Sequence, residues 1–272
     1  MLSDEERAQA AAVLAQAEAD RKPIRPLIET FPAMDVVDSY EIALINIRER
    51  LEGGVTVLGH KVGLSSEAMQ QMMGVDEPDY GHLLSDMALT EDRPVDVSRY
   101  CYPRVEVEVG FVLGKTLPGE ECTEDDVLAA TEYVAPAIEL IDSRIVDWQI
   151  GLVDTIADNA SSAGFVLGSQ RVRPADIDLL SIDATLTRNG EVVAEGRSDA
   201  VLGNPVTAVA WLARKVAGFG VRLEAGHVIL PGSCTRAIDV RPGDDFRAEF
   251  KGLGSVSLSF TDDFTNDAGS DE

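Results

Sequence analysis

Cysteine, histidine and lysine are scarce in this chain of 272 residues. The three cysteines (Cys101, Cys122 and Cys234) are odd in number and far apart, which argues against a disulfide framework and a CxxC zinc pair. No run reaches the roughly 18 apolar residues of a membrane span. The N-terminus, MLSDEERAQA, lacks the basic and apolar regions of a signal peptide. These absences predict a soluble, cytoplasmic protein.

Positive charge is also in short supply. The 48 acidic residues outnumber the 23 basic ones, and the formal net charge is −25. Such a chain repels nucleic acid and anionic membranes. The acids are spread along the sequence, and 45% of residues are hydrophobic, so we expect a folded protein with a carboxylate-rich surface. The low lysine and high aspartate counts resemble proteins of salt-accumulating organisms. The last residues, 263–272, are expected to form a frayed acidic tail.

Helical patterns dominate the first part of the chain. Ser3 followed by Glu6 suits a capping box, and Val37, Tyr40 and Leu44 follow helical spacing. The expected elements are a helix over 4–20, a helix over 36–52, a strand over 55–62 and a short helix ending at 72. We therefore assign residues 1–75 to a small helical N-terminal region.

From residue 76 to 262 the patterns predict a β-rich domain. Val105, Val107 and Val109 alternate with other residues as in a strand, and Asn189-Gly190 is a strong hairpin signal. The expected elements are a helix over 124–133, a strand over 137–142, hairpin strands over 184–188 and 191–195, a helix from 205, and apolar segments at 227–230, 246–250 and 256–260. The predicted fold class is α+β.

Three acids form the most informative pattern. Glu106 and Glu108 share one face of the predicted strand, roughly 6.6 Å apart at Cα. Glu139 lies in a second apolar segment, where an acid needs a partner. Three converging carboxylates suit Mg²⁺ or Mn²⁺. A solvated strand face, with Glu139 paired to an arginine such as Arg144, explains the same pattern, and spacing alone leaves both open.

Three further segments are candidates for a site. Lys61, in GHKVG, is a cation among apolar and glycine residues, although most lysines lie at the surface. Asp79 belongs to the acidic turn DEPDYG, and Ser161 to the polar segment DNASSAG. Ordinary loops also have such compositions.

Other chemistries lack support in the sequence. GxSxG, HExxH and the dinucleotide fingerprint are absent. His60, His82 and His227 are isolated from one another along the chain, and each is expected to be structural.

Several motifs occur in one order: GHKVGLSSEAMQ, DEPDYGHLLSDM, PRVEVEVGFVL, APAIELIDSR, DTIADNASSAGFVLG, LPGSCTRAIDVRPGD and GLGSVSLSF. From about residue 35 to 260, the chain closely resembles the 2-hydroxypenta-2,4-dienoate (2-oxopent-4-enoate) hydratases. This group includes the 4-oxalocrotonate decarboxylases and 2-oxohept-4-ene-1,7-dioate hydratases, within the fumarylacetoacetate-hydrolase superfamily. The resemblance implies a mixed β-sheet roll or barrel.

The resemblance also assigns roles. It implies that Glu106, Glu108 and Glu139 bind Mg²⁺ or Mn²⁺. Lys61 and Asp79 match the family's active-site lysine and aspartate, and the Ser161 loop lines its substrate pocket. The implied reaction adds water to 2-hydroxypenta-2,4-dienoate, giving 4-hydroxy-2-oxopentanoate in aromatic meta-cleavage catabolism. The implied assembly is a homo-oligomer of five or ten subunits, with possible association with a pathway enzyme.

Related reactions remain open. Decarboxylation of 4-oxalocrotonate needs the same carboxylates, and hydrolytic cleavage of an acylpyruvate ranks lower because His60 has no acid partner in the sequence. A diacid hydratase needs an extra cation for its distal carboxylate. The segment between Arg144 and Asp154 adds no basic residue, which favours a small monocarboxylate, although Arg236 stays a candidate for a second carboxylate. A role as a partner subunit without activity is disfavoured by the intact motifs.

Overall fold

The computed structural model describes residues 1–262, and the predicted acidic tail, 263–272, lies outside the described residues. Its helices are α1 (Asp4–Asp20), α2 (Leu27–Thr30), α3 (Val36–Glu52), α4 (Glu67–Met73), α5 (Glu124–Ala130), α6 (Leu152–Ala157) and α7 (Pro205–Ala217). Its strands are β1 (Val57–Gly63), β2 (Asp79–Leu84), β3 (Val95–Asp96), β4 (Arg104–Leu113), β5 (Thr131–Ile141), β6 (Ser162–Leu167), β7 (Asp183–Arg188), β8 (Glu191–Arg197), β9 (Val228–Leu230), β10 (Ile238–Asp239), β11 (Asp245–Phe250) and β12 (Gly254–Thr261). No helix within this range is long and apolar enough to cross a bilayer.

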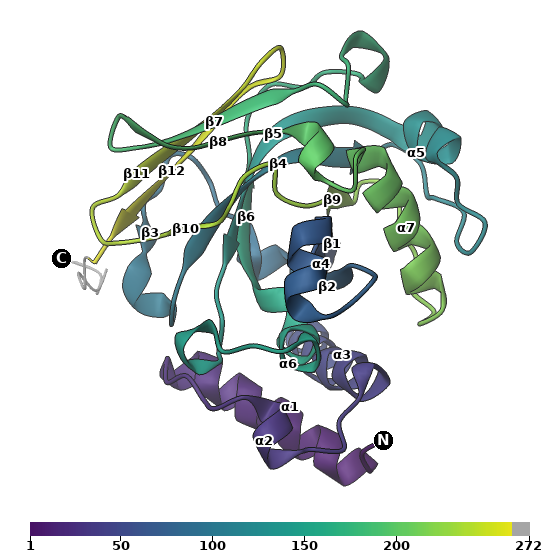
Figure 1. Ribbon diagram of the computed structural model, residues 1–272, viewed down its shortest axis with the longest axis vertical. Coiled ribbons are helices and arrows are strands. Elements are labelled where there is room, and N and C mark those ends of the chain that lie inside the picture. Colours follow the sequence, from purple (N-terminus) through teal and green to yellow (C-terminus); the bar gives the residue numbers. More distant parts are fainter. Residues whose placement is uncertain (263–272) are drawn as a thin grey trace, which may run out of the picture.

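Two mixed sheets form the body of the protein (Figure 1). The larger has the order β2–β1–β9–β4–β5–β6, and β10 pairs with the N-terminal end of β4. The smaller has the order β3–β12–β11–β7–β8. Most neighbours are antiparallel, but β1 runs parallel to β9 and β12 parallel to β3. The α+β class expected from the sequence is confirmed.

The two faces of the large sheet have opposite characters. Along β4, Val105, Val107 and Val109 are buried in the main core, together with side chains of the second sheet and α7. Because side chains alternate along a strand, Glu106 and Glu108 lie on the other face. The apolar face therefore fixes the sheet in the core, and the opposite face carries the two carboxylates.

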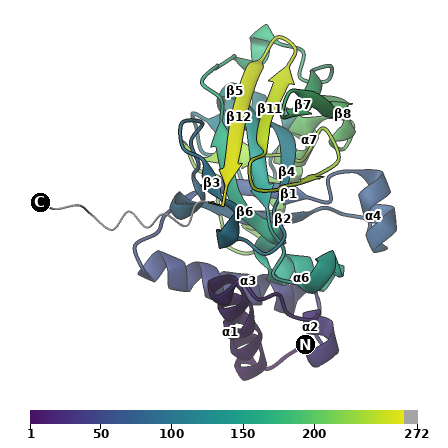
Figure 2. The ribbon, with the colours of Figure 1, turned by 90° about the vertical axis from the view of Figure 1, so that its left-hand side faces the viewer.

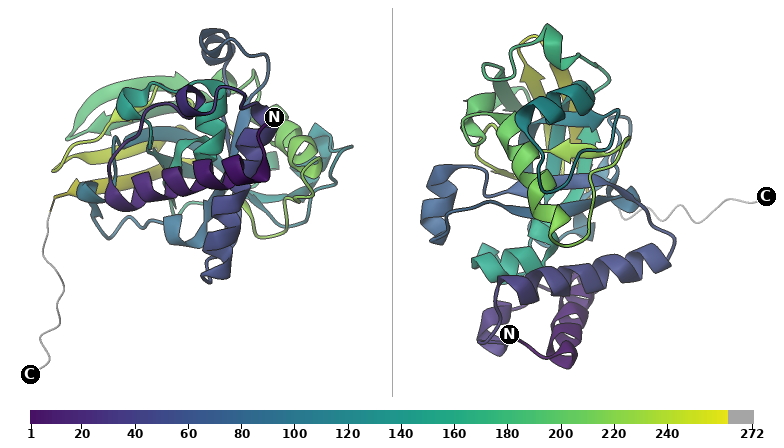
Figure 3. Two further views of the ribbon diagram at one scale, coloured as in Figure 1. Left: turned by 90° about the horizontal axis from the view of Figure 1, so that it is seen from below. Right: turned by 90° about the vertical axis from the view of Figure 1, so that its right-hand side faces the viewer.

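Helices α1, α2 and α3 gather at one end of the molecule, and α3 lies between α1 and the sheets (Figure 3). A separate apolar cluster holds them, including Leu14, Leu27 and Ile42. The strand β1 falls within residues 1–75, yet it pairs with β2 and β9 in the large sheet. This pairing favours a boundary just after α3 over one at residue 75.

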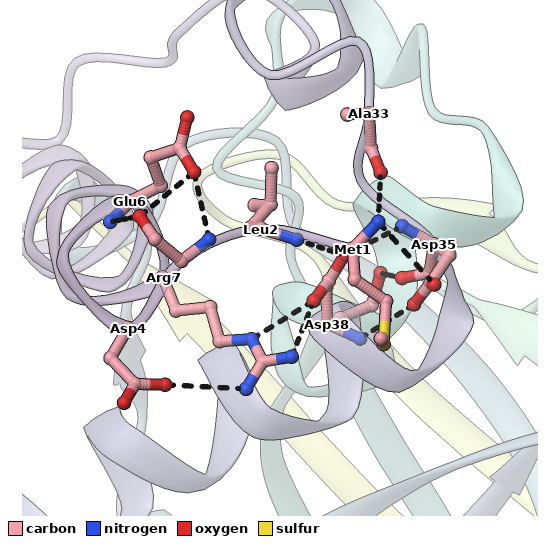
Figure 4. A network of polar contacts seen from close by, with 10 residues as sticks. Met1, Leu2, Asp4, Glu6, Arg7, Ala33, Asp35 and Asp38 are labelled. Atoms are coloured by element: carbon pink, nitrogen blue, oxygen red, sulfur yellow. Dashed lines mark hydrogen bonds and ion pairs between the residues drawn. The ribbon is translucent and has the colours of Figure 1, made fainter.

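The buried carboxylate of Asp38 ties the N-terminus to α3 (Figure 4). It accepts hydrogen bonds from the backbone N–H of Leu2 at 2.9 Å and from that of Asp35 at 3.1 Å. The Arg7 guanidinium donates two more, from Nε at 2.9 Å and Nη2 at 2.7 Å. Asp38 thus joins α1 to α3 by contacts far apart in the sequence.

Most predicted elements are present at nearly the predicted bounds. Helix α1 begins with the predicted Ser3–Glu6 capping box, and α3 has the predicted bounds. Asn189 and Gly190 both have positive φ, at 53° and 84°, as the predicted hairpin requires.

One predicted helix is too long. The helix expected over 124–133 ends at Ala130, and Thr131 already begins β5. The Thr131 hydroxyl donates to the Val127 carbonyl at 2.7 Å, which closes the helix, while its backbone pairs with Leu113 of β4. Pairing with a distant strand outweighs local helical preference here.

Candidate metal centre

Three glutamates of β4 and β5 converge on one point. Glu106 lies directly opposite Glu139 in the antiparallel ladder, and Glu108 is two residues further along the same face. One carboxylate oxygen from each lies within 4.8 Å of the others. Glu108 and Glu139 are fully buried, whereas Glu106 is half-buried.

The carboxylates fit a divalent cation because their oxygens are not satisfied by the protein. Glu108 Oε2 accepts the Gly232 N–H at 2.7 Å, but Glu108 Oε1 accepts no hydrogen bond. Neither oxygen of Glu139 accepts one of good geometry. Buried carboxylate oxygens that accept no hydrogen bond are costly, and an all-oxygen donor set suits a hard ion such as Mg²⁺ or Mn²⁺.

The pKa values of the three carboxyls reflect the same crowding. Burial raises the pKa of Glu106, and burial with the charges of Glu139 and Glu106 raises the pKa of Glu108 well above its usual range. Burial raises the pKa of Glu139 to about 7, partly offset by Lys61. A bound dication would reverse these shifts, because it favours the ionised carboxylates.

Lys61 is buried beside the carboxylates and is no surface lysine. Its Nζ lies 3.3 Å from Glu139 Oε1 and donates to the Ala160 carbonyl at 3.0 Å. Burial opposes its charge, but the surrounding carboxylates outweigh burial and raise the pKa of Lys61. Lys61 is therefore a fixed ammonium at the edge of the carboxylate cluster.

Asp79 lies on the same face as Lys61, one strand away. It begins β2 opposite Gly63, the last residue of β1. A Cβ at Gly63 would lie 2.1 Å from Asp79 Oδ1, so the carboxylate rests over the bare glycine backbone. Oδ1 is buried without a hydrogen-bond partner, and burial raises the pKa of Asp79 to about 6, partly offset by Lys61.

Ser161 belongs to a strained loop next to Lys61. Asn159, Ala160 and Ser161 all have positive φ, between 50° and 57°, which is rare for consecutive non-glycine residues. This loop supplies the carbonyl that accepts from Lys61. The Ser161 hydroxyl is buried and lies 3.4 Å from that of Thr155.

The chain matches the family model described as fumarylacetoacetate (FAA) hydrolase C-terminal over residues 60–260. The chain belongs to the fumarylacetoacetate hydrolase family. The matched range contains every site residue predicted from the sequence, and the resemblance drawn from the motifs is confirmed.

Relatives within the fumarylacetoacetate hydrolase family align with nearly the whole chain. A 2-keto-4-pentenoate hydratase of Paraburkholderia xenovorans (strain LB400) is 45% identical over 259 residues, covering 95% of this chain and 96% of the relative. A 2-oxo-hept-4-ene-1,7-dioate hydratase of Escherichia coli is 42% identical over 253 residues, covering 91% and 95%. The solved structure of 4-oxalocrotonate decarboxylase from Pseudomonas putida G7, complexed with magnesium and adipate, has a TM-score of 0.92 at 36% identity, covering 96% and 99%.

Two arginines considered from the sequence have other partners in this fumarylacetoacetate hydrolase family member. Arg144 does not pair with Glu139; it is buried against Asp158, with Nε 2.5 Å from Oδ1. Arg236 donates to the Val193 carbonyl of β8 at 2.9 Å.

The three histidines, which are far apart along the chain, lie close together in space. His60 lies opposite His82 in the β1–β2 ladder, and their ring centroids are 4.8 Å apart. The ring of His227 lies 5.8 Å from that of His60. By strand alternation His60 faces away from Lys61, so this cluster lies on the apolar side of the sheet. Burial lowers the pKa of His82 to about 4, and that of His60 also falls.

Sequence reasoning missed the residues that hold the site in shape. The Asn159 amide bonds the backbone of His82 twice: Oδ1 accepts from its N–H at 2.7 Å, and Nδ2 donates to its carbonyl at 3.0 Å. Gly81 leaves room for this loop, because a Cβ there would lie 2.4 Å from the Asn159 carbonyl oxygen. The available signal was an asparagine, which tolerates positive φ, two residues before Ser161.

Proposed function

We propose that the protein is a metal-dependent hydratase that adds water to 2-hydroxypenta-2,4-dienoate to give 4-hydroxy-2-oxopentanoate. The observation that carries the proposal is the convergence of three glutamates beside a buried lysine, with oxygens of Glu108 and Glu139 that accept no hydrogen bond. The 45% identity to a 2-keto-4-pentenoate hydratase supports the choice of substrate.

The reaction needs protons delivered to carbon and water added to a conjugated bond. Protonation of the dienoate at C5 gives a 2-oxo-3-enoate; hydroxyl addition at C4 and protonation at C3 then complete the hydration. A divalent cation, Mg²⁺ or Mn²⁺, held by Glu106, Glu108 and Glu139, would supply a Lewis acid for the 2-oxo acid group.

The side chains around the carboxylates have separate tasks in this proposal. The fixed ammonium of Lys61 holds the substrate carboxylate or donates a proton. Asp79, with its unpartnered buried Oδ1, moves protons or orients water. The Ser161 loop closes the substrate pocket beside Lys61.

The proposal is tested by a product assay on freshly generated 2-hydroxypenta-2,4-dienoate, with Mg²⁺, with Mn²⁺ and with chelator. We expect metal-dependent 4-hydroxy-2-oxopentanoate by NMR, abolished in Lys61→Met and retained in Lys115→Met, which removes an exposed lysine. A Lys61→Met enzyme with wild-type turnover would exclude the role of Lys61.

Metal binding has its own readout. Glu108→Gln keeps an acceptor for the Gly232 N–H and replaces the buried acid with a neutral amide. Without metal, we expect this variant to be more stable to heat than the parent protein; with Mg²⁺ in excess, we expect the order to reverse. Thermal unfolding in both conditions measures this crossing, and an unchanged order would overturn the metal site.

The second candidate is 4-oxalocrotonate decarboxylase activity, which the TM-score of 0.92 to that enzyme favours. Release of CO₂ from 4-oxalocrotonate, with the dienoate left untouched, would replace the hydratase proposal. A cytoplasmic homo-oligomer of five or ten subunits completes the proposal, and light scattering measures its size.

A further inference from the structure

The carboxylate cluster becomes more exposed toward the N-terminal end of β4. Along the shared face of this strand, exposure falls from Arg104, whose side chain is 34% exposed, through half-buried Glu106 to fully buried Glu108. A 2-oxo acid that reached the glutamates with its carboxylate end would therefore have its distal end on the more exposed side, where Arg104 lies.

Arg104, at the N-terminal end of β4, is held in place by two neighbouring side chains. Its Nε lies 2.7 Å from Asp239 Oδ1, and its guanidinium lies over the Trp148 ring, 4.4 Å from the centroid. The Trp148 indole N–H donates to the Tyr102 carbonyl at 3.1 Å, which fixes the ring. Asp239 is opposite Arg104 in the β10–β4 ladder, so the fold itself brings the two charges together.

Arg104 is two residues from Glu106 on the same face of β4, so its side chain is next to the cluster along the strand. Lys61 already forms an ion pair with Glu139 and donates a hydrogen bond to the Ala160 carbonyl. Arg104 is thus the cation that a second substrate carboxylate would meet at this end of β4, and Asp239 neutralises it there.

We propose that the Arg104–Asp239 pair makes the site selective for 2-oxo acids with an uncharged distal end, and against diacids. This inference rests on the proposed function, because it concerns the same site. A second carboxylate would have to approach Asp239 and displace it from Arg104, which costs free energy through like-charge repulsion. A methyl end incurs no such cost.

Two ligands of equal length isolate this effect. 2-Oxohexanoate and 2-oxoadipate differ only in a terminal methyl or carboxylate, and their dissociation constants from the Mg²⁺-loaded protein are measured by calorimetry. We expect the parent protein to bind 2-oxohexanoate more tightly. In Asp239→Asn we expect the affinity ratio to shift toward the diacid at least about tenfold, which corresponds to about 1.4 kcal/mol.

Further variants separate electrostatics from structure. Arg104→Gln combined with Asp239→Asn should lose the shift, because the freed cation is gone. Asp176→Asn, which breaks an exposed pair with Arg173 elsewhere, serves as the matched control and should leave the ratio unchanged. Because the effect is one of charge, it should shrink as KCl is raised.

Either of two results would overturn the inference: a parent protein that binds 2-oxoadipate at least as tightly as 2-oxohexanoate, or an Asp239→Asn protein with an unchanged ratio. Failure of the proposed function appears separately, as a missing hydration product in the assay on the dienoate. The binding ratio does not depend on that assay.

Discussion

The left-handed run from Asn159 to Ser161 stores strain beside Lys61, and the Asn159 amide joins it to the backbone of β2. We predict that Asn159→Ala lowers kcat at least about tenfold and destabilises the protein by about 2 kcal/mol, because two backbone groups of His82 lose their partners. Turnover, Mg²⁺ titration and denaturant unfolding measure these effects. Mg²⁺ affinity should change little, because the glutamates lie on other strands.

Two companion variants sharpen this prediction. Asn159→Gly accepts positive φ without strain but also lacks the amide, so we expect it to lose activity as well. Ser162→Ala removes a neighbouring buried hydroxyl that has no hydrogen-bond partner, and its turnover should match that of the parent protein. Full activity in Asn159→Gly would show that strain, and not the amide, matters.

The site requires a glycine at position 63, because a side chain there would overlap Asp79. We predict that Gly63→Ala lowers turnover at least about a hundredfold, because its Cβ would overlap the Asp79 carboxylate at 2.1 Å. Gly218→Ala is the control, since its Cβ would lie 3.5 Å from the nearest backbone oxygen and its backbone is helical. Steady-state kinetics on both variants measures the difference, and equal losses would contradict the steric argument.

Among the helices, α1 is linked to α3 by the buried acid Asp38 as well as by the apolar cluster that they share. Burial alone would raise the pKa of Asp38, but hydrogen bonds from Arg7 and from the N–H groups of Asp35 and Leu2 lower it below its usual value. The ionised carboxylate therefore stabilises the fold above the unfolded-state pKa, and this contribution is lost as the pH falls through the lower folded-state pKa.

We accordingly predict that Arg7→Met lowers the melting temperature by about 3 °C near neutral pH, and that the gap to the parent protein narrows toward about pH 3. Thermal unfolding of both proteins across this range gives the comparison. The two proteins are compared at each pH because the buried histidines lower the stability of both in acid. The lowered pKa values of these histidines favour the unfolded state below about pH 6.5. A gap that widens in acid would contradict the role of Asp38.

Local patterns predicted the elements well where the signal was local. Caps and helical spacing placed α1 and α3, and Asn189-Gly190 placed the β7–β8 turn. The predicted end of α5 was wrong because Thr131 pairs with β4, a strand earlier in the chain. The sequence around Thr131 does not indicate this pairing.

In the candidate site, too, local patterns predicted some features, and long-range strand pairing determined the others. Alternation along β4 correctly put Glu106 and Glu108 on one face, but only the register with β5 places Glu139 opposite Glu106. The contacts of Lys61 with Glu139 and Ala160, and the fit of Asp79 over Gly63, depend on strand pairing that spacing cannot give. The histidine cluster was missed for the same reason.

For the molecule as a whole, the net charge of −25 is the dominant electrostatic feature. We predict that raising KCl from about 0.05 M to about 2 M increases the melting temperature by at least about 5 °C, because screening weakens the repulsion among surface carboxylates. Sucrose, which does not screen charge, is the control solute. A melting temperature that is unchanged or falls in KCl would argue against adaptation to salt.

The segment between β1 and β2 contains α4 and projects from the body of the protein (Figure 2). This segment affects how the fold can change over evolutionary time. The ladder closes with Gly63 opposite Asp79, so the positions of Lys61 and Asp79 are set by strand pairing and not by the chain that joins them. We therefore expect that changes in the length of residues 67–76 leave both groups in place. The same independence lets the candidate site acquire new neighbours at its rim while its own geometry stays unchanged.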